Sequence, residues 1–119
     1  MTNNITDAEL VIMDIIWDGG DTKAMDIARI AGELRGWEKN TVYTMITRLT
    51  KKGIVERIEP GYVCHALVDR ETYQKSESKN VVNKLFRGSL SLFARAFLEE
   101  NKLSDEEIDE LRGIINDNK

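Results

Sequence analysis

Apolar residues recur every three or four positions through the first half of the chain, and this spacing predicts three short helices. The first helix follows the capping box Thr6-Asp7-Ala8-Glu9 and stops at Asp18-Gly19-Gly20, where glycine accepts a left-handed conformation. It is apolar on more than one side, so we expect it to be a buried core helix. The second helix ends at Gly36, and its apolar positions are Ile27, Ile30, Ala31 and Leu34.

The third predicted helix lies in Trp37–Gly53 and has two unlike faces. Four apolar residues at i, i+3, i+4 and i+7 share one side and should pack on a core: Val42, Met45, Ile46 and Leu49. The other side offers hydroxyls, an amide, a phenol and cations, which suit base edges and phosphates. No carboxylate occurs from Lys39 to Lys52, so this face does not repel a polyanion. We interpret it as a recognition helix. The second interpretation is an ordinary amphipathic helix with a solvated polar face.

Two strands are predicted next, Ile54–Ile58 and Tyr62–Leu67, joined by a tight turn at Glu59-Pro60-Gly61. Two helices, a polar-faced third helix and a hairpin, in that order, define a winged helix-turn-helix. In this fold the third helix enters a DNA major groove and the hairpin lies along the backbone. The expected fold class is therefore mostly α with a small β-hairpin wing, followed by a C-terminal helical dimerisation region.

The C-terminal part has helical patterns but no core of its own. Residues 71–99 form a long apolar-periodic stretch that Gly88 and Ser89 interrupt, which predicts a kink or a break into two helices. A last helix starts at the capping box Ser104-Asp105-Glu106-Glu107. We expect these helices to intertwine with those of a second chain. The alternative is an intramolecular helical cap on the winged helix. The predicted dimerisation residues are Leu85, Phe86, Leu90, Phe93, Leu111 and Ile115.

Charge is distributed unevenly along this 119-residue chain of formal net charge −4. Residues 35–57 contain six basic and two acidic side chains, whereas residues 99–117 contain eight acidic and two basic ones. An acidic total argues against nonspecific coating of nucleic acid, and only the basic segment could face phosphates. The chain length fits one small domain with an oligomerising extension. We place the winged-helix DNA-binding domain in residues 1–69 and the helical dimerisation region in residues 70–119.

Other classes of protein find little support in the sequence. Cys64 is the only cysteine, so an intrachain disulfide is excluded, and Cys64 with His65 lacks the further ligands that a metal requires. Neither a nucleophile paired with a base nor a phosphate-cradling glycine loop is evident, so we predict neither an enzyme nor a cofactor. The chain has no apolar run long enough to span a bilayer and begins with a polar segment unlike a signal peptide. We therefore expect a cytoplasmic protein without membrane insertion.

Three motifs resemble the penicillinase-repressor family of the BlaI/MecI type, which also includes the copper-responsive CopY repressors. They are T-D-A-E-L-x-I-M-D-I-I-W at residues 6–17, G-W-x-x-x-T-V-x-T-x-I-T-R-L-x-K-K-G at residues 36–53, and F-L-E-E-N-K-L-S-D-E-E-I-D-E-L-R at residues 97–112. The resemblance covers nearly the whole chain, and the middle motif is the most specific. It implies a dimeric winged-helix repressor of a palindromic operator. In several family members a membrane sensor that detects a β-lactam triggers proteolytic inactivation.

The resemblance also implies roles for individual residues. The family's T-x-x-T-x-x-x-R pattern falls on Thr41, Thr44 and Arg48, whereas Asn40 and Tyr43 stand where the resistance repressors carry further basic residues. The family's Asn-Phe cleavage bond corresponds here to Ala96-Phe97. The copper branch carries C-terminal cysteine pairs, and residues 102–119 contain none, so copper sensing is not implied. The full set of predicted DNA-binding residues is Lys39, Asn40, Thr41, Tyr43, Thr44, Thr47, Arg48 and Lys51.

The sequence thus leads to a homodimeric transcriptional repressor whose partners are operator DNA, a second copy of itself and a sensor-activated protease. Genes of β-lactam resistance, or related genes, are the expected targets. The alternative function is a winged-helix module that serves protein interaction without binding DNA.

Overall fold

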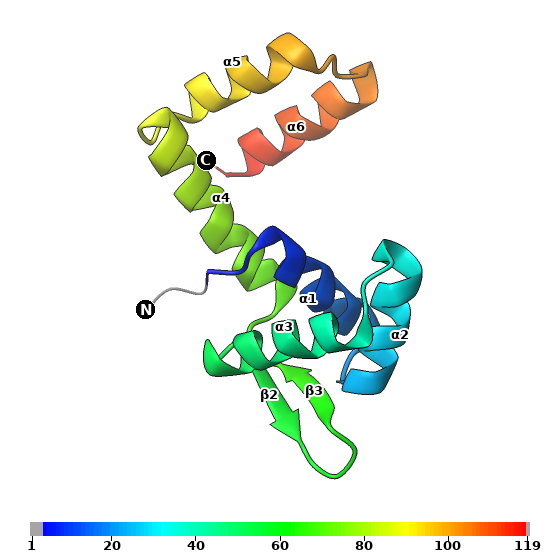
Figure 1. Ribbon diagram of the computed structural model, residues 1–119. Coiled ribbons are helices and arrows are strands. Elements are labelled where there is room, and N and C mark those ends of the chain that lie inside the picture. Colours follow the sequence, from blue (N-terminus) through cyan, green and yellow to red (C-terminus); the bar gives the residue numbers. More distant parts are fainter. Residues whose placement is uncertain (1–3, 119) are drawn as a thin grey trace. The chain divides into compact units, whose positions relative to one another are not determined.

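The computed structural model describes residues 4–118, which fold into six helices and three short strands (Figure 1). The elements are α1 (Asp7–Gly19), β1 (Thr22–Lys23), α2 (Ala24–Arg35), α3 (Lys39–Lys51), β2 (Val55–Ile58), β3 (Val63–Ala66), α4 (Arg70–Phe86), α5 (Leu90–Glu100) and α6 (Asp105–Asp117). Two compact units divide the chain, Met1–Gln74 and Lys75–Lys119. Within the described residues, none of the helices has both the length and the apolar character that crossing a bilayer requires.

The ends of the first helices follow from local sequence chemistry. The Glu9 amide donates to Thr6 Oγ1 at 3.1 Å, and the Thr6 amide donates to Glu9 Oε1 at 2.9 Å, so the predicted capping box is confirmed. Gly36, with φ of 70°, ends α2 in the left-handed region, and its amide donates to the Gly32 carbonyl at 2.9 Å. These caps fix where the chain turns from one helix into the next.

The predicted hairpin is present and belongs to a three-stranded antiparallel sheet. Strands β2 and β3 pair with Val55 opposite Ala66 and Ile58 opposite Val63. Strand β1 pairs with the other edge of β3, giving the order β1-β3-β2. Three helices followed by this hairpin confirm the predicted winged-helix fold, and β1 is an addition to it.

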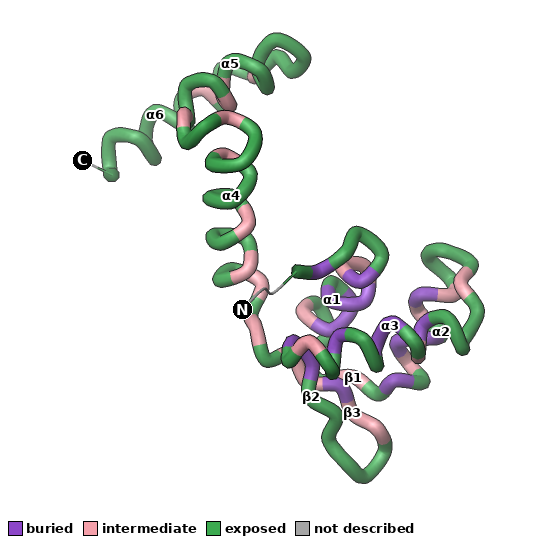
Figure 2. Tube along the Cα trace, turned by 60° about the vertical axis from the view of Figure 1, so that its left-hand side comes forward, coloured by how far each residue is buried: buried purple, intermediate pink, exposed green. Residues whose placement is uncertain are grey.

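The core of the first unit lies where α1, α2 and α3 meet the sheet (Figure 2). The four apolar residues predicted for the inner side of α3 are all buried, and α1 contributes more buried residues than any other element. The helix pattern therefore predicted the inner side of α3 correctly, whereas on α2 only Ile27 and Ala31 of the four predicted apolar positions are buried, and Leu34 is 62% exposed. The apolar members of the core are Ile5, Ile12, Met13, Ile15, Ile16, Ala24, Ile27, Ala28, Ala31, Val42, Met45, Ile46, Leu49, Ile54, Val55 and Cys64.

The first turn of α4 packs against α1 inside the first unit. Trp17 Nε1 donates to the Val68 carbonyl at 2.9 Å, and the Trp17 and Tyr73 rings lie 5.9 Å apart. Arg70 donates to Asp18 Oδ1 at 2.7 Å and stacks over Trp17 at 5.4 Å. Because of these contacts, the first turn of α4 belongs to the first unit, which ends at Gln74, whereas the predicted boundary follows residue 69.

The second unit consists of amphipathic helices that bury little. The stretch breaks at Gly88, whose φ of 81° favours glycine, and Ser89 caps α5 by accepting from the Leu92 amide at 3.1 Å. The predicted capping box at Ser104 opens α6. Phe93 contacts Phe86 edge to face at 5.5 Å and stacks on Phe97 at 6.3 Å. Among the described residues of α4, α5 and α6, none is buried (Figure 2).

Candidate nucleic-acid interface

Helix α3 presents a polar surface because its apolar stripe fixes it on the core. The predicted DNA-binding residues all lie on this helix, and seven of the eight are exposed. Tyr43 is the exception, since it is half-buried against the core. The structure thus brings the predicted residues together on one helix, with Tyr43 at the edge of the exposed face.

The exposed cations of α3 are free of ion pairs. Lys39, Arg48 and Lys51 form no salt bridge with any described residue. Two neighbouring cations are paired: Lys52 bonds to Glu9, and Arg57 on the wing bonds to Glu59. The outward side of α3 therefore offers three unpaired positive charges to a phosphate backbone.

Glu9 and Lys52 form an ion pair that joins the start of α1 to the end of α3. Lys52 Nζ lies 2.6 Å from Glu9 Oε1 and 3.0 Å from the Asn4 carbonyl. Glu9 is only 1% exposed, and burial raises its pKa, but hydrogen bonds from Lys52 and from the Thr6 amide outweigh this and leave the pKa below its usual value. Lys52 therefore holds α3 against α1 and is not free to contact DNA.

Aromatic rings join α3 to the wing. The rings of Tyr43 and Tyr62 meet edge to face at 5.7 Å, and the Arg57 guanidinium lies 3.7 Å from the Tyr62 ring centre. Lys39 lies over the Tyr43 ring at 5.6 Å. Arg57 and Tyr62 are not among the DNA-binding residues predicted from the sequence. The available signal was a cation on a predicted wing strand and an aromatic residue directly after its turn.

The threonine hydroxyls of α3 differ in what they can donate. Thr44 Oγ1 donates to the Asn40 carbonyl at 2.9 Å, and Thr47 Oγ1 donates to the Tyr43 carbonyl at 3.0 Å. The Thr41 hydroxyl forms no hydrogen bond with any described residue, so it keeps a free donor. Thr41 can therefore donate to an anion without breaking a bond within the helix.

Cys64 and His65 lie on β3 but serve different contacts. Cys64 is buried, and burial raises the pKa of its thiol to about 11. His65 Nδ1 lies 2.7 Å from Asp21 Oδ1, and this hydrogen-bonded carboxylate raises the pKa of His65. Among residues 4–118, no group of three or more His, Cys, Asp and Glu side chains could hold a metal ion.

The predicted dimerisation residues lie on all three helices of the second unit. Leu85, Leu90, Leu111 and Ile115 are exposed, whereas Phe86 and Phe93 are half-buried against each other. A hollow of about 500 Å³ lies between α4 and α5, with Val81, Val82, Leu90 and Phe93 among its lining residues. The proposed cleavage residues Ala96 and Phe97 lie inside α5.

The sequence matches known proteins along almost its whole length. The penicillinase repressor family matches residues 5–117. The methicillin resistance regulatory protein MecI of Mammaliicoccus sciuri is 35% identical over 117 residues, which cover 97% of this chain and 95% of that protein. The penicillinase repressor of Bacillus licheniformis is 32% identical over 117 residues, covering 97% of this chain and 91% of that protein.

Solved structures match the N-terminal unit. The solution structure of the DNA-binding domain of the repressor BlaI aligns with a TM-score of 0.55 at 29% identity, covering 59% of this chain and 88% of that one. The monomeric form of Bacillus licheniformis BlaI in complex with the blaP half-operator aligns with a TM-score of 0.53 at 27% identity, covering 61% and 92%. The chain therefore belongs to the penicillinase repressor family, whose members are DNA-binding transcriptional repressors and not enzymes.

Proposed function

We propose that the protein is a homodimeric transcriptional repressor that inserts α3 into the major groove of each half of a palindromic operator. One observation carries the proposal: α3 exposes unpaired cations, hydroxyls and an amide, with no carboxylate along Lys39–Lys52. Such a surface can bind phosphates and base edges. The structure of BlaI with a half-operator supports the same use of the matching unit.

The contacts divide by chemistry. Lys39 and Lys51 carry long cations suited to phosphates, whereas Asn40, Tyr43, Thr44 and Thr47 offer groups suited to base edges. The wing, joined to α3 through Tyr43 and Tyr62, lies along the DNA backbone in this arrangement.

Dimerisation is proposed through the second unit, because its helices leave large apolar side chains in water. Leu85, Leu90 and Ile115 are each more than 60% exposed. Burying such a side chain in an interface gains about 1.5 to 3 kcal/mol, so two copies of this unit should associate. Two linked winged helices would then bind two half-sites together.

The names of the relatives suggest the regulated genes and the signal. MecI is named for regulating methicillin resistance, and the Bacillus protein for repressing a penicillinase. We propose genes of β-lactam resistance, or related genes, as targets, with relief by a sensor-activated protease that cuts between Ala96 and Phe97. Because this bond lies inside α5, the helix must unwind locally before a protease can reach it. Cleavage would separate α6, with Leu111 and Ile115, from the rest of the dimerisation surface.

The decisive test is binding of the full chain to a labelled duplex from the promoter of its own operon, measured by fluorescence anisotropy with a random duplex as control. We expect saturable binding to the promoter, one dimer per site in sedimentation, and a weaker, salt-sensitive affinity for the random duplex. Equal affinity for both duplexes would contradict operator recognition. Mass spectrometry of the chain from cells treated with a β-lactam tests the cleavage separately, since a fragment ending at Ala96 is expected.

A further inference from the structure

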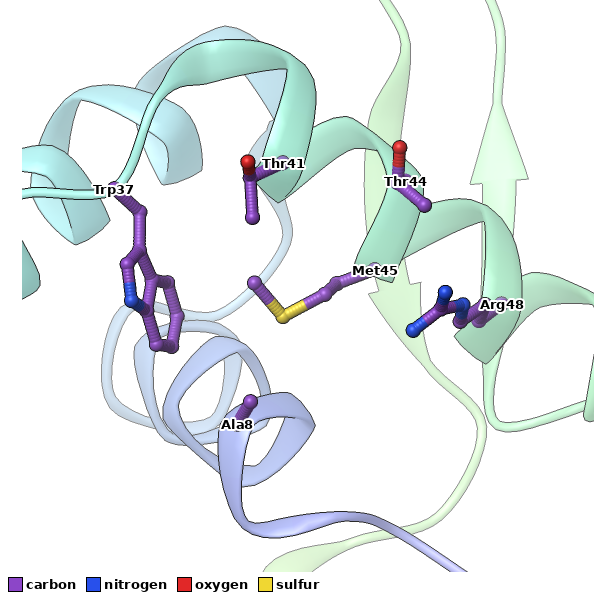
Figure 3. A pocket seen from close by; sticks show the side chains of 6 residues that line it. All are labelled: Ala8, Trp37, Thr41, Thr44, Met45 and Arg48. Carbon is purple, nitrogen blue, oxygen red and sulfur yellow. The ribbon is translucent and has the colours of Figure 1, made fainter.

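A hollow of about 390 Å³ lies beside the recognition helix, between the start of α1 and the outward side of α3 (Figure 3). We call it the α1–α3 hollow. Trp37 stands on one side and Arg48 on the other, with the sulfur and methyl group of Met45 between them (Figure 3). Its lining residues are Ala8, Trp37, Thr41, Thr44, Met45 and Arg48.

The lining divides into an apolar part and a donor part. The Trp37 indole, the Met45 side chain and the Ala8 methyl form an apolar surface, and Figure 3 shows the methyl of Thr41 turned toward Met45. The guanidinium of Arg48 reaches in from the opposite side. A ligand that fits must therefore present a compact apolar body next to an anionic group.

The charges around the hollow favour an anion. Arg48 has no ion pair with any described residue, and the Thr41 hydroxyl keeps its donor free. Of the described residues that line the hollow, none carries a carboxylate. The hollow is also continuous with the exposed face of α3, since Thr41, Thr44 and Arg48 belong to both.

We propose that the α1–α3 hollow receives one deoxyribose and its phosphate from the operator backbone, an inference that rests on the proposed function. The phosphate accepts hydrogen bonds from Arg48, and the sugar packs on Trp37, Met45 and the methyl group of Thr41, whose hydroxyl is turned out of the hollow (Figure 3). A sugar with its phosphate has the two parts that the lining requires, and operator DNA is the polyanion next to this face.

This assignment gives two residues new roles. Arg48, which can reach either a phosphate or a guanine edge, binds a phosphate and so positions α3 without reading sequence. Trp37, half-buried and preceding α3, becomes a DNA-contact residue outside the recognition helix. The backbone contacts of Trp37 and Arg48 in the α1–α3 hollow then help to determine how deeply α3 enters the groove.

The experiment uses the full chain and a duplex selected by binding from a random pool. Methylphosphonate linkages, which are uncharged, replace the phosphates of one half-site one at a time. At one linkage, we expect neutralisation to weaken DNA binding by the natural chain. The same neutralised linkage should weaken binding by the Arg48→Met variant little further, because that variant already lacks the contact. Arg48→Met alone should lose about tenfold to a hundredfold per half-site, as a charge-assisted hydrogen bond predicts. The variant should lose as much affinity for a random duplex. The slope of log affinity against log salt concentration should be lower by about 0.9 per half-site.

The two tryptophans supply a matched control. In Trp17→Phe, the remaining emission comes from Trp37 and should become protected from acrylamide when the duplex is added. In Trp37→Phe, the emission comes from Trp17, which packs against Tyr73, and its quenching should not change. Circular dichroism shows whether both variants fold.

Two results would overturn the proposal while leaving the proposed function intact. One is an Arg48→Met loss confined to operator and traced to one base pair, which would make Arg48 a base reader. The other is unchanged quenching of Trp37 on a duplex that binds normally. Failure of the natural chain to prefer any selected duplex would instead contradict the proposed function itself.

Discussion

The two units of this chain use the same kind of helix with different outcomes. Helices α1 and α6 both begin with a capping box and both carry an apolar stripe. The stripe of α1 lies in a core with residues at or near zero exposure, whereas Ile114 and Ile115 of α6 remain about 60% exposed. The difference shows that local helix signals specify where a helix begins, while burial depends on what the rest of the chain supplies. We therefore expect the first unit to fold alone and the second to require another copy.

Removing the second unit tests this difference most strongly. A chain that ends at Gln74 keeps the core and the contacts of Trp17, so we expect it to fold as a monomer. Its affinity for a full operator should fall by about 10² to 10⁴, because the two half-site contacts are no longer linked. Anisotropy measures this loss, and a half-operator duplex is the control on which both chains should bind equally. An unfolded fragment, or an unchanged operator affinity, would contradict the comparison.

Matched isoleucine truncations in the two units form the next test. Ile46→Ala removes a fully buried side chain and should lower the free energy of unfolding by about 2 to 5 kcal/mol. Ile115→Ala removes a side chain that is 62% exposed and belongs to the predicted dimerisation residues, so it should leave the first unit unchanged and weaken only the dimer. Both tryptophans lie in the first unit, so denaturant unfolding followed by their emission reports that unit, and sedimentation reports the dimer. Equal losses of unfolding free energy in the two variants, measured by tryptophan emission, would contradict the comparison.

Ion pairs of the two units should differ in the same direction. Lys52→Met leaves the buried Glu9 carboxylate without its cation and should cost on the order of 1 to 3 kcal/mol. Arg112→Met removes an exposed pair with Asp109 and should change stability by less than about 0.5 kcal/mol.

The stability that the ion pair of Glu9 and Lys52 contributes should depend on pH. The folded-state pKa of Glu9 lies below its usual value of 4.5, so its stabilisation is present above that pH and is lost as the pH falls through the lower, folded pKa. Glu9→Gln should remove this part of the acid destabilisation. Urea unfolding between pH 7 and pH 3 measures it, and identical pH profiles for both chains would show that Glu9 contributes nothing.

The smallest expected effect concerns the unpaired cations. Lys51→Ala should weaken operator and random duplex alike, and should lower the salt slope by about 0.9 for each half-site. Lys102→Ala, in the acidic C-terminal part, should leave the slope unchanged. Affinities at four salt concentrations decide the matter. A Lys51 variant with an unaltered slope would remove that side chain from the phosphate contacts.

Much of the winged helix could be predicted from local patterns, because caps, glycine stops and the buried stripe of α3 depend on residues close in sequence. The strand β1 could not, since two residues show no alternation and form a strand only by pairing with β3. The role of Lys52 was also hidden. Lys52 directly follows α3, but its partner Glu9 lies 43 residues away along the chain. Long-range polar pairs of this kind follow from the fold and leave no periodic signal.

The hydrogen bonds that two threonines form within α3 determine which groups the exposed side of this helix can offer to DNA. Since Thr44 and Thr47 donate their protons to backbone carbonyls, they can offer a DNA groove only lone pairs and methyl groups. Lone pairs can accept from the amino groups of adenine or cytosine, and the methyl groups can pack on that of thymine, but the acceptor edge of guanine gains nothing from either. We expect the bases opposite these two threonines to exclude guanine, and sequencing of selected duplexes would show whether they do. In the proposed complex, the hydrogen bonds within α3 would thus limit which bases the operator carries opposite Thr44 and Thr47, and these bonds are already formed in the protein without DNA.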